Sequence, residues 1–186
     1  MTGTSLLEKH KDLARRKTRE EFAVEVEGCF LLWEPPSEGA EDGGFFTGVV
    51  SIDVLKARHD ASADRPAASP EVFLAKVSKR AENSWLTWIT VGRAGNNDIV
   101  IKHPSVSKLH ARIDTSAPIS ADHELADRSG FWITDTGSKN GTSVNGTKLD
   151  KGAPRAIRPG DRLSFGEVVA RFCDAGLLHD EIARRF

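Results

Sequence analysis

The chain contains 186 residues, of which 39% are hydrophobic and 28% are charged, and its formal net charge at pH 7 is −1. This length suffices for one well-buried domain with an appendage or for two small domains, and the composition is that of soluble globular proteins. The near-zero charge excludes the global basic field that holds duplex nucleic acid by counterion release, so we expect locally recognised partners and no nucleic acid.

The two cysteines, Cys29 and Cys173, are far apart in sequence, and each lies in an apolar stretch (GCFLLW and ARFCDA). A secreted disulfide scaffold would contain more cysteines, and a zinc site would need clustered Cys or His. The N-terminal residues lack the long apolar core of a signal peptide, and no run approaches the length of a membrane span. We therefore expect two reduced, buried thiols in a cytoplasmic protein without a membrane partner.

The first predicted element is a helix over residues 4–20. Thr4 or Ser5 is suited to the N-cap, and Glu8 is placed to complete a capping box with Ser5. Few apolar residues line one face of this helix, so it is marginal on its own and needs to pack against another element. Its excess of Lys and Arg is interpreted as a solvated face.

From Phe22 the hydrophobic residues recur with a period of two, which predicts a strand that is interrupted near Gly28. A second β-type run, FFTGVVSIDVL, occupies residues 45–55. Residues 59–70 are rich in Ala, Ser, Asp and Pro and contain no large apolar residue, so we predict a linker there. One helix, two strands and this linker define an N-terminal extension over residues 1–70.

Short β-type runs separated by turns follow the linker, from VFLAKVS to VVARF, with no long amphipathic helix among them. This spacing is typical of an antiparallel β-sandwich, which we place over residues 71–174. The last residues, 175–186, return to helical spacing and predict a short C-terminal helix. The predicted fold class is therefore mainly β.

Three polar loops flank strands of the predicted sandwich. VGRAGNNDIVI contains Arg93, HPSVSKLHARI contains Ser107 and Lys108, and DTGSKNGTSVNG contains Lys139 and Asn140. Loops of a sandwich gather at the ends of its sheets, and these side chains carry the hydrogen-bond donors that a phosphate dianion needs. Each also has an ordinary structural explanation: a surface ion pair for Arg93, a turn for Ser107 and the left-handed position of a hairpin turn for Asn140. On composition alone both interpretations stay open.

An enzyme is disfavoured by the motifs. The sequence has no nucleophile elbow, no Walker phosphate loop, no H-E-x-x-H and no C-x-x-C. Ser107, His110 and Asp135 are the residue types of a catalytic triad, but three common residues need the right geometry to act as one. The histidines are scattered along the chain. We therefore predict no catalytic residue, no metal and no cofactor.

The polar motifs taken together resemble the series found in the forkhead-associated (FHA) domain family. The resemblance covers residues 72–174, and several of its motifs occur together at compatible spacings. In chain order they are Gly92-Arg93, Asp98-Ile99, Ser107 to His110 (SKLH), Asp135, Ser138 to Thr142 (SKNGT), Asn145-Gly146 and Gly160-Asp161.

The resemblance implies an eleven-stranded β-sandwich that binds phosphothreonine in extended segments of partner proteins. By position, Arg93 and Ser107 would contact the phosphate, and Lys108 would add a donor. Lys139 stands where family members often have Ser or Thr, and its main chain or ammonium group would face the phosphopeptide. Asn140 would hydrogen-bond the main chain of the ligand. A small apolar niche for the threonine methyl group would favour phosphothreonine over phosphoserine.

The resemblance also implies residues that support the site without touching the ligand. Gly92 would give the backbone room beside the arginine, and His110 would tie the serine loop to the strand behind it. Gly141 and Thr142 would shape the third loop. The pair Asn145 and Gly146 would close the hairpin that follows it.

The expected function is therefore that of a phosphothreonine-dependent interaction module in Ser/Thr kinase signalling. Its partner would be a phosphothreonine-containing protein, such as a kinase or a kinase substrate. The alternative is a phosphate-independent FHA scaffold or a module for homotypic oligomerisation. Intact Arg93, Ser107 and Asn140 favour the first interpretation, because a domain that does not bind phosphate would not need them.

Overall fold

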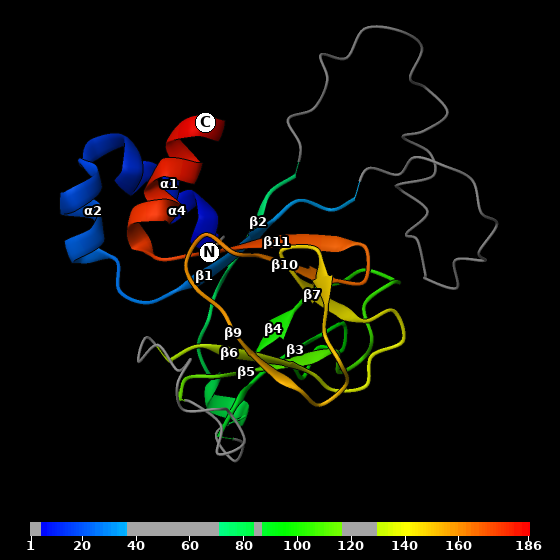
Figure 1. Ribbon diagram of the computed structural model, residues 1–186. Helices are drawn as coiled ribbons and strands as arrows, with labels where there is room; N and C mark the ends of the chain where they lie inside the picture. The colour runs from blue at the N-terminus through cyan, green and yellow to red at the C-terminus, as the bar shows by residue number, and fades with distance from the viewer. Residues whose placement is uncertain (1–4, 37–70, 84–86, 117–129) are drawn as a thin grey trace, which may run out of the picture. The chain divides into compact units, whose positions relative to one another are not determined.

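A computed structural model of the chain describes residues 5–36, 71–83, 87–116 and 130–186. These residues form two β-sheets, with three α-helices grouped beside one of them (Figure 1). The predicted fold class, a mainly β FHA-like sandwich with an N-terminal helix and strand extension and a short C-terminal helix, is confirmed.

The first sheet, called sheet A, is six-stranded with the order β2-β1-β11-β10-β7-β8. All the neighbouring strands in it are antiparallel. Its strands are β1 (Phe30–Trp33), β2 (Phe73–Lys76), β7 (Thr142–Val144), β8 (Thr147–Lys148), β10 (Arg162–Phe165) and β11 (Val168–Cys173).

The second sheet, sheet B, is five-stranded with the order β4-β3-β5-β6-β9. Its strands are β3 (Ile89–Gly92), β4 (Ile99–Val100), β5 (Ala111–Asp114), β6 (Trp132–Asp135) and β9 (Pro154–Ala156), and a 3-10 turn, η1 (Ala81–Asn83), precedes β3. The pair β3 and β4 is parallel, so this sheet is mixed and not purely antiparallel as the sequence suggested. Strand β9 was not predicted, because it is short and polar and begins with proline, which sheets accept at an edge.

The main hydrophobic core lies between the two sheets, and alternate residues of the strands supply it. In β10, for example, Leu163 and Phe165 are fully buried while Arg162 is exposed. Fully buried members of this core include Leu31, Val91, Ala111, Ile113, Ile133, Leu163, Phe165, Ala170 and Phe172.

The N-terminal region differs from the prediction. The single helix expected over residues 4–20 is two helices, α1 (Leu6–Arg16) and α2 (Arg19–Glu25). The strand expected from Phe22 begins within α2, and only its part after Gly28 is a strand, β1. The physical reason is Thr18, whose hydroxyl accepts a hydrogen bond from the Glu21 main chain while the Glu21 carboxylate accepts one from the Thr18 N–H. This capping box starts a new helix and overrides the period-two pattern.

The three helices cover the outer face of sheet A at β1 and β11 through a second core. Helix α4 (Ala175–Arg185) begins at Asp174, whose carboxylate accepts a hydrogen bond from the Leu177 N–H. Phe22 of α2, Phe30 of β1 and Leu178 of α4 are buried in this core. Strand β1 is apolar at every position because it is covered on both faces.

Strand β1 therefore belongs to a sheet of the sandwich, since it pairs with β11 on one side and β2 on the other. The strand expected at residues 45–55 and the linker expected at 59–70 lie outside the described residues. The division into residues 1–70, 71–174 and 175–186 stays a prediction.

Cys29 and Cys173 are free and buried, as expected from the sequence. Burial raises the pKa of the Cys29 thiol to about 11 and that of the Cys173 thiol to about 12, so both are protonated at neutral pH. In the described part of the chain no helix is long and apolar enough to cross a membrane, and no group of acidic, histidine or cysteine side chains could hold a metal ion.

The helical core yields a test that separates the observed structure from the period-two pattern. Phe22 is fully buried, whereas Val24, which the pattern places on the same side, is 83% exposed. Replacing Phe22 by Ala should lower the free energy of unfolding by about 3–5 kcal/mol because it leaves a cavity. Val24→Ala should change it by less than about 0.5 kcal/mol. Urea unfolding of both variants measures the difference, and equal losses would contradict the helical assignment.

Candidate functional site

Three loops meet at one end of the sandwich and are called the site loops: residues 93–98, 101–110 and 136–141. The first two run side by side and are joined by main-chain hydrogen bonds, of which the Arg93 N–H to the Ser107 carbonyl is 2.9 Å long. The third loop reaches the second through the Lys139 N–H, which donates to the Ser107 hydroxyl oxygen over 3.0 Å. The structure therefore brings together the polar segments that the sequence singled out.

Gly92 lies where the first two loops approach most closely. A Cβ atom at this position would lie 2.4 Å from the Lys108 carbonyl oxygen and 2.9 Å from the Asn97 amide nitrogen. Both atoms are held, because that Asn97 nitrogen donates to the Lys108 carbonyl over 2.7 Å. Only glycine leaves room for this contact, so Gly92 sets the spacing between the two loops that carry Arg93 and Ser107.

His110 is fully buried and joins the second loop to the third. Its Nδ1 accepts a hydrogen bond from the Ser107 N–H over 3.0 Å, and its Nε2 lies 3.0 Å from the Gly141 carbonyl oxygen. Because a carbonyl oxygen only accepts, the ring proton must be on Nε2 and the ring must be neutral. Burial lowers the pKa of His110, and it does so more strongly than the Gly141 hydrogen bond and the Asp135 charge raise it.

The buried carboxylate of Asp135 holds the third loop in place through hydrogen bonds. It accepts hydrogen bonds from the Gly137 and Ser138 N–H groups and from the Ser138 and Thr142 hydroxyls, at 2.6–2.9 Å. Burial by itself raises the pKa of Asp135, but these hydrogen bonds outweigh burial and hold it below its ordinary value. Ser138 in turn accepts the Gly141 N–H, so the loop closes on itself.

Asp98, the last residue of the first loop, ties that loop to residues outside it. Its carboxylate accepts hydrogen bonds from Lys79, from the Arg80 main chain, and from the main chain and hydroxyl of Thr90. Burial raises the pKa of Asp98, but these donors together lower it to about 2, so the group is ionised. The sequence alone assigned no structural role to Asp98, Asp135 or Ser138. Their occurrence in the motif series was the feature that could have indicated such a role.

The donors that the sequence analysis assigned to the phosphopeptide lie at the surface of these loops. Arg93 is exposed, and its Nε donates to the Val106 carbonyl oxygen over 3.1 Å. Among the described residues no carboxylate pairs with Arg93, Lys108 or Lys139 and no acceptor takes the Ser107 hydroxyl proton. Arg93, Lys108 and Lys139 therefore offer three cations without a carboxylate partner in the described part of the chain, and Ser107 offers a hydroxyl donor near them.

Asn140 lies beside them with its side chain partly engaged. Asn140 is exposed, and its amide nitrogen donates to the Ser105 carbonyl oxygen over 2.7 Å, which fixes the orientation of the amide. The alternative that Asn140 is a left-handed turn residue is wrong, because among the described non-glycine residues only Asn145 has a positive φ.

The sequence of this region matches a known family. Residues 89–166, which include all three site loops, match the model of the FHA domain. The chain contains an FHA domain. This confirms the resemblance inferred from the motifs.

Relatives of this FHA domain occur in longer proteins and as solved structures. Nibrin of Gallus gallus is 36% identical over 86 residues, which are 46% of this chain and 11% of nibrin, so the match spans about a tenth of that relative. The structure of the MEK1 FHA domain with a phosphothreonine peptide of HOP1 is 21% identical, with a TM-score of 0.37, and covers 47% of this chain and 79% of that one. An FHA domain of an Arabidopsis thaliana hypothetical protein is 30% identical, with a TM-score of 0.37, over 47% of this chain and 66% of that one.

Ser107, His110 and Asp135 of the FHA domain are not arranged as a catalytic triad. His110 bonds the main-chain N–H of Ser107 and not its hydroxyl, and that hydroxyl accepts from Lys139. The Asp135 carboxylate is occupied by the third loop. These three residues therefore hold the loops in place and are not arranged to activate a nucleophile.

The hairpin after the third loop keeps the end of the FHA domain in register. Asn145 and Gly146 have φ values of 51° and 82°, the pattern of a type I′ turn between β7 and β8. The Asn145 side chain donates to the Asp161 carboxylate and accepts from the Arg162 N–H. Gly141, with a φ of 88°, also requires the left-handed region, where glycine is favoured.

The close approach at Gly92 gives a matched pair of glycine substitutions. Gly92→Ala should lower the free energy of unfolding by about 2–3 kcal/mol, because the new methyl group meets fixed main-chain atoms. Gly95→Ala, in the same loop, should change it by no more than about 0.5 kcal/mol, because no atom lies within 4 Å of the added Cβ. Thermal or urea unfolding measures both. A harmless Gly92→Ala would show that the two loops are not held at this distance.

Proposed function

We propose that this FHA domain binds phosphothreonine in an extended segment of a partner protein. The observation that carries the proposal is the group of unpaired donors on the site loops: the guanidinium of Arg93, the ammonium groups of Lys108 and Lys139, and the free hydroxyl proton of Ser107. A phosphothreonine carries about −1.5 to −2 charge and three strong acceptor oxygens at neutral pH. The solved complex of the MEK1 FHA domain with a phosphothreonine peptide supports the same ligand class.

Arg93 and Ser107 are proposed to contact the phosphate directly. The Nε bond of Arg93 to the Val106 carbonyl holds the guanidinium plane, so its terminal nitrogens lose little freedom when they meet an anion. The Ser107 hydroxyl oxygen already accepts the Lys139 N–H, and no described residue accepts its proton, so the hydroxyl can donate to a ligand. Each such charge-assisted bond contributes about 1.5–3 kcal/mol.

Lys108 and Lys139 are proposed to supplement these contacts, and Asn140 to hold the main chain of the ligand. The two ammonium groups act as point charges on flexible stems, which suits the edge of the phosphate. Asn140 differs from them because its amide is fixed by the Ser105 carbonyl. A fixed amide with a free oxygen can accept a main-chain N–H of an extended peptide, as side-chain amides do in other peptide sites.

The partner is proposed to be a Ser/Thr kinase or one of its substrates, because phosphothreonine is the product of that reaction. The unmodified threonine offers none of the charge that the site loops complement, so binding would follow the phosphorylation state of the partner. The module itself would act in signalling by association and not by catalysis.

The test compares one peptide library in its threonine, phosphothreonine and phosphoserine forms. Wild-type protein should bind the phosphothreonine form, and Arg93→Ala should weaken that binding by about 2–5 kcal/mol, since it leaves the anion under-compensated. Arg155→Ala removes an exposed arginine from β9 and should leave the affinity unchanged. Isothermal titration calorimetry measures all three proteins.

Two outcomes would overturn the proposal. Equal affinity for threonine and phosphothreonine peptides would indicate a phosphate-independent scaffold instead. Equal losses for Arg93→Ala and Arg155→Ala would indicate a nonspecific electrostatic effect.

A further inference from the structure

A second cationic surface lies on the outer face of sheet A, and its arginines come from β10, β11 and α4 and not from the site loops. Arg162 of β10 and Arg171 of β11 are direct cross-strand neighbours on this face. Like charges at directly opposite positions of an antiparallel pair destabilise the sheet. We therefore expect a carboxylate or a bound anion to offset the repulsion between Arg162 and Arg171.

Helix α4 adds two more arginines, Arg184 and Arg185, to this surface. The buried carboxylate of Glu181 lies close to both of them and to Arg171. Glu181 is 6% exposed, and its Oε2 accepts from Arg184 over 2.5 Å and from Arg185 over 3.3 Å. The Arg171 Nε lies 3.3 Å from the other oxygen of Glu181 without forming a hydrogen bond. Arg185 has a further partner in Glu34. Three guanidinium groups thus share one buried carboxylate, and only one of them has a second.

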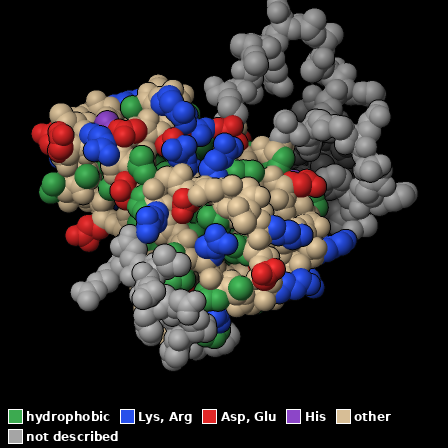
Figure 2. Space-filling model, in the orientation of Figure 1, with side chains coloured by type: hydrophobic (Ala, Val, Ile, Leu, Met, Phe, Trp, Pro, Cys, Tyr) green, Lys and Arg blue, Asp and Glu red, His purple; other side chains and the backbone are tan. Residues whose placement is uncertain are grey.

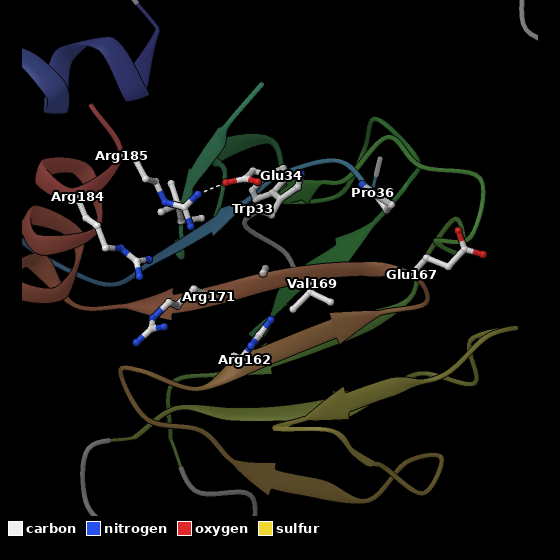
Figure 3. A pocket seen from close by; sticks show the side chains of 11 residues that line it. Trp33, Glu34, Pro36, Arg162, Glu167, Val169, Arg171, Arg184 and Arg185 are labelled. Carbon is white, nitrogen blue, oxygen red and sulfur yellow. Dashed lines mark hydrogen bonds and ion pairs between the residues drawn. The ribbon is translucent and has the colours of Figure 1, made fainter. Parts of the chain in front are cut away.

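Arg162 is the arginine of this surface that has no carboxylate partner among the described residues. Its main-chain N–H bonds the Asn145 side chain, but in the described ranges no carboxylate pairs with its guanidinium group. Figure 3 shows Arg162 beside Val169, with Arg171 and Arg184 on the same side of the sheet. In the space-filling view, Lys and Arg side chains gather where α4 meets this sheet (Figure 2).

These residues line a groove of about 400 Å³. Its floor is partly aliphatic, because Leu32 lines it and Val169, which is 40% exposed, points outward from β11. Glu34 and Glu167 also line it, so acidic side chains interrupt the positive wall (Figure 3). The groove therefore combines unpaired positive charge with a short apolar strip.

We propose that this groove binds an acidic segment of a partner protein in extended conformation. Side chains of an extended segment alternate, so carboxylates could pair with Arg162 and Arg171 while an aliphatic residue packs on Val169. A peptide that carries carboxylates only at alternate side chains can place them on the arginines and keep them away from Glu34 and Glu167, whereas the continuous phosphates of a nucleic acid or a membrane surface would also lie against these two carboxylates. The groove arginines belong to β10, β11 and α4 and not to the three site loops, although Glu167 of the groove donates its main-chain N–H to Ser105 of the second loop.

The probe is a fluorescein-labelled peptide library in which glutamate alternates with variable aliphatic residues, titrated against the full chain by fluorescence polarisation. The best-binding acidic peptide should lose about tenfold or more in affinity with Arg162→Glu, since one charge-assisted pair becomes a repulsion. The matched control is Arg155→Glu in β9, which makes the same charge change on the other sheet and should leave the affinity within about twofold. Arg162→Glu should leave phosphothreonine-peptide binding unchanged.

The same three proteins are titrated with anionic vesicles of phosphatidylserine and phosphatidylcholine and with a DNA duplex. Binding of either that is lost selectively in Arg162→Glu, with none for the peptides, would overturn the assignment of the ligand as a peptide. Absence of peptide binding at millimolar concentration, or equal losses for the two arginine variants, would overturn the site itself. Circular dichroism of each variant establishes that it is folded.

Discussion

The buried imidazole of His110 is the interaction on which the candidate site depends. It accepts the Ser107 N–H on one side and donates to the carbonyl of Gly141, 31 residues further along the chain, on the other, so a single ring sets the distance between the second and third loops. Such a bridge works only while the ring is neutral, since a charged imidazole has no acceptor. Burial supplies this condition by lowering the pKa of His110.

The other polar groups buried beneath the loops extend the same arrangement. Asp135 satisfies main-chain donors of the third loop, and Asp98, at the end of the first loop, accepts from the main chains of Arg80 and Thr90; both carboxylates are buried. Because these buried groups hold the loop backbone, Arg93 and the Ser107 hydroxyl can bind an anion without first breaking a hydrogen bond or an ion pair to a carboxylate of the protein. Preorganisation of this kind lowers the ordering cost of binding. The carboxylates of Asp98 and Asp135 are buried beneath the loops, whereas Arg93, Lys108 and Lys139 are exposed.

The sequence was sufficient for some of these features and not for others, for identifiable reasons. Alternation in RLSF and VVARF predicted the strands correctly because period two reports burial directly, and Asn145-Gly146 predicted its turn because the left-handed region favours those residues. The start of α2 was missed because the Thr18 capping box outweighs the same periodicity. The roles of Asp98 and Asp135 were missed because their hydrogen-bond partners become visible only when the loops meet. The arginine groove required the register of β10 and β11, which no local pattern contains.

The most direct test of this account is the protonation state of one ring. Long-range proton–nitrogen NMR spectra of His110 at neutral pH distinguish its two neutral tautomers from the charged form. The account predicts a neutral ring with its proton on Nε2, both in the free protein and after addition of a phosphothreonine peptide. A proton on Nδ1, or a charged ring in either state, would contradict the claim that His110 joins the loops of the site.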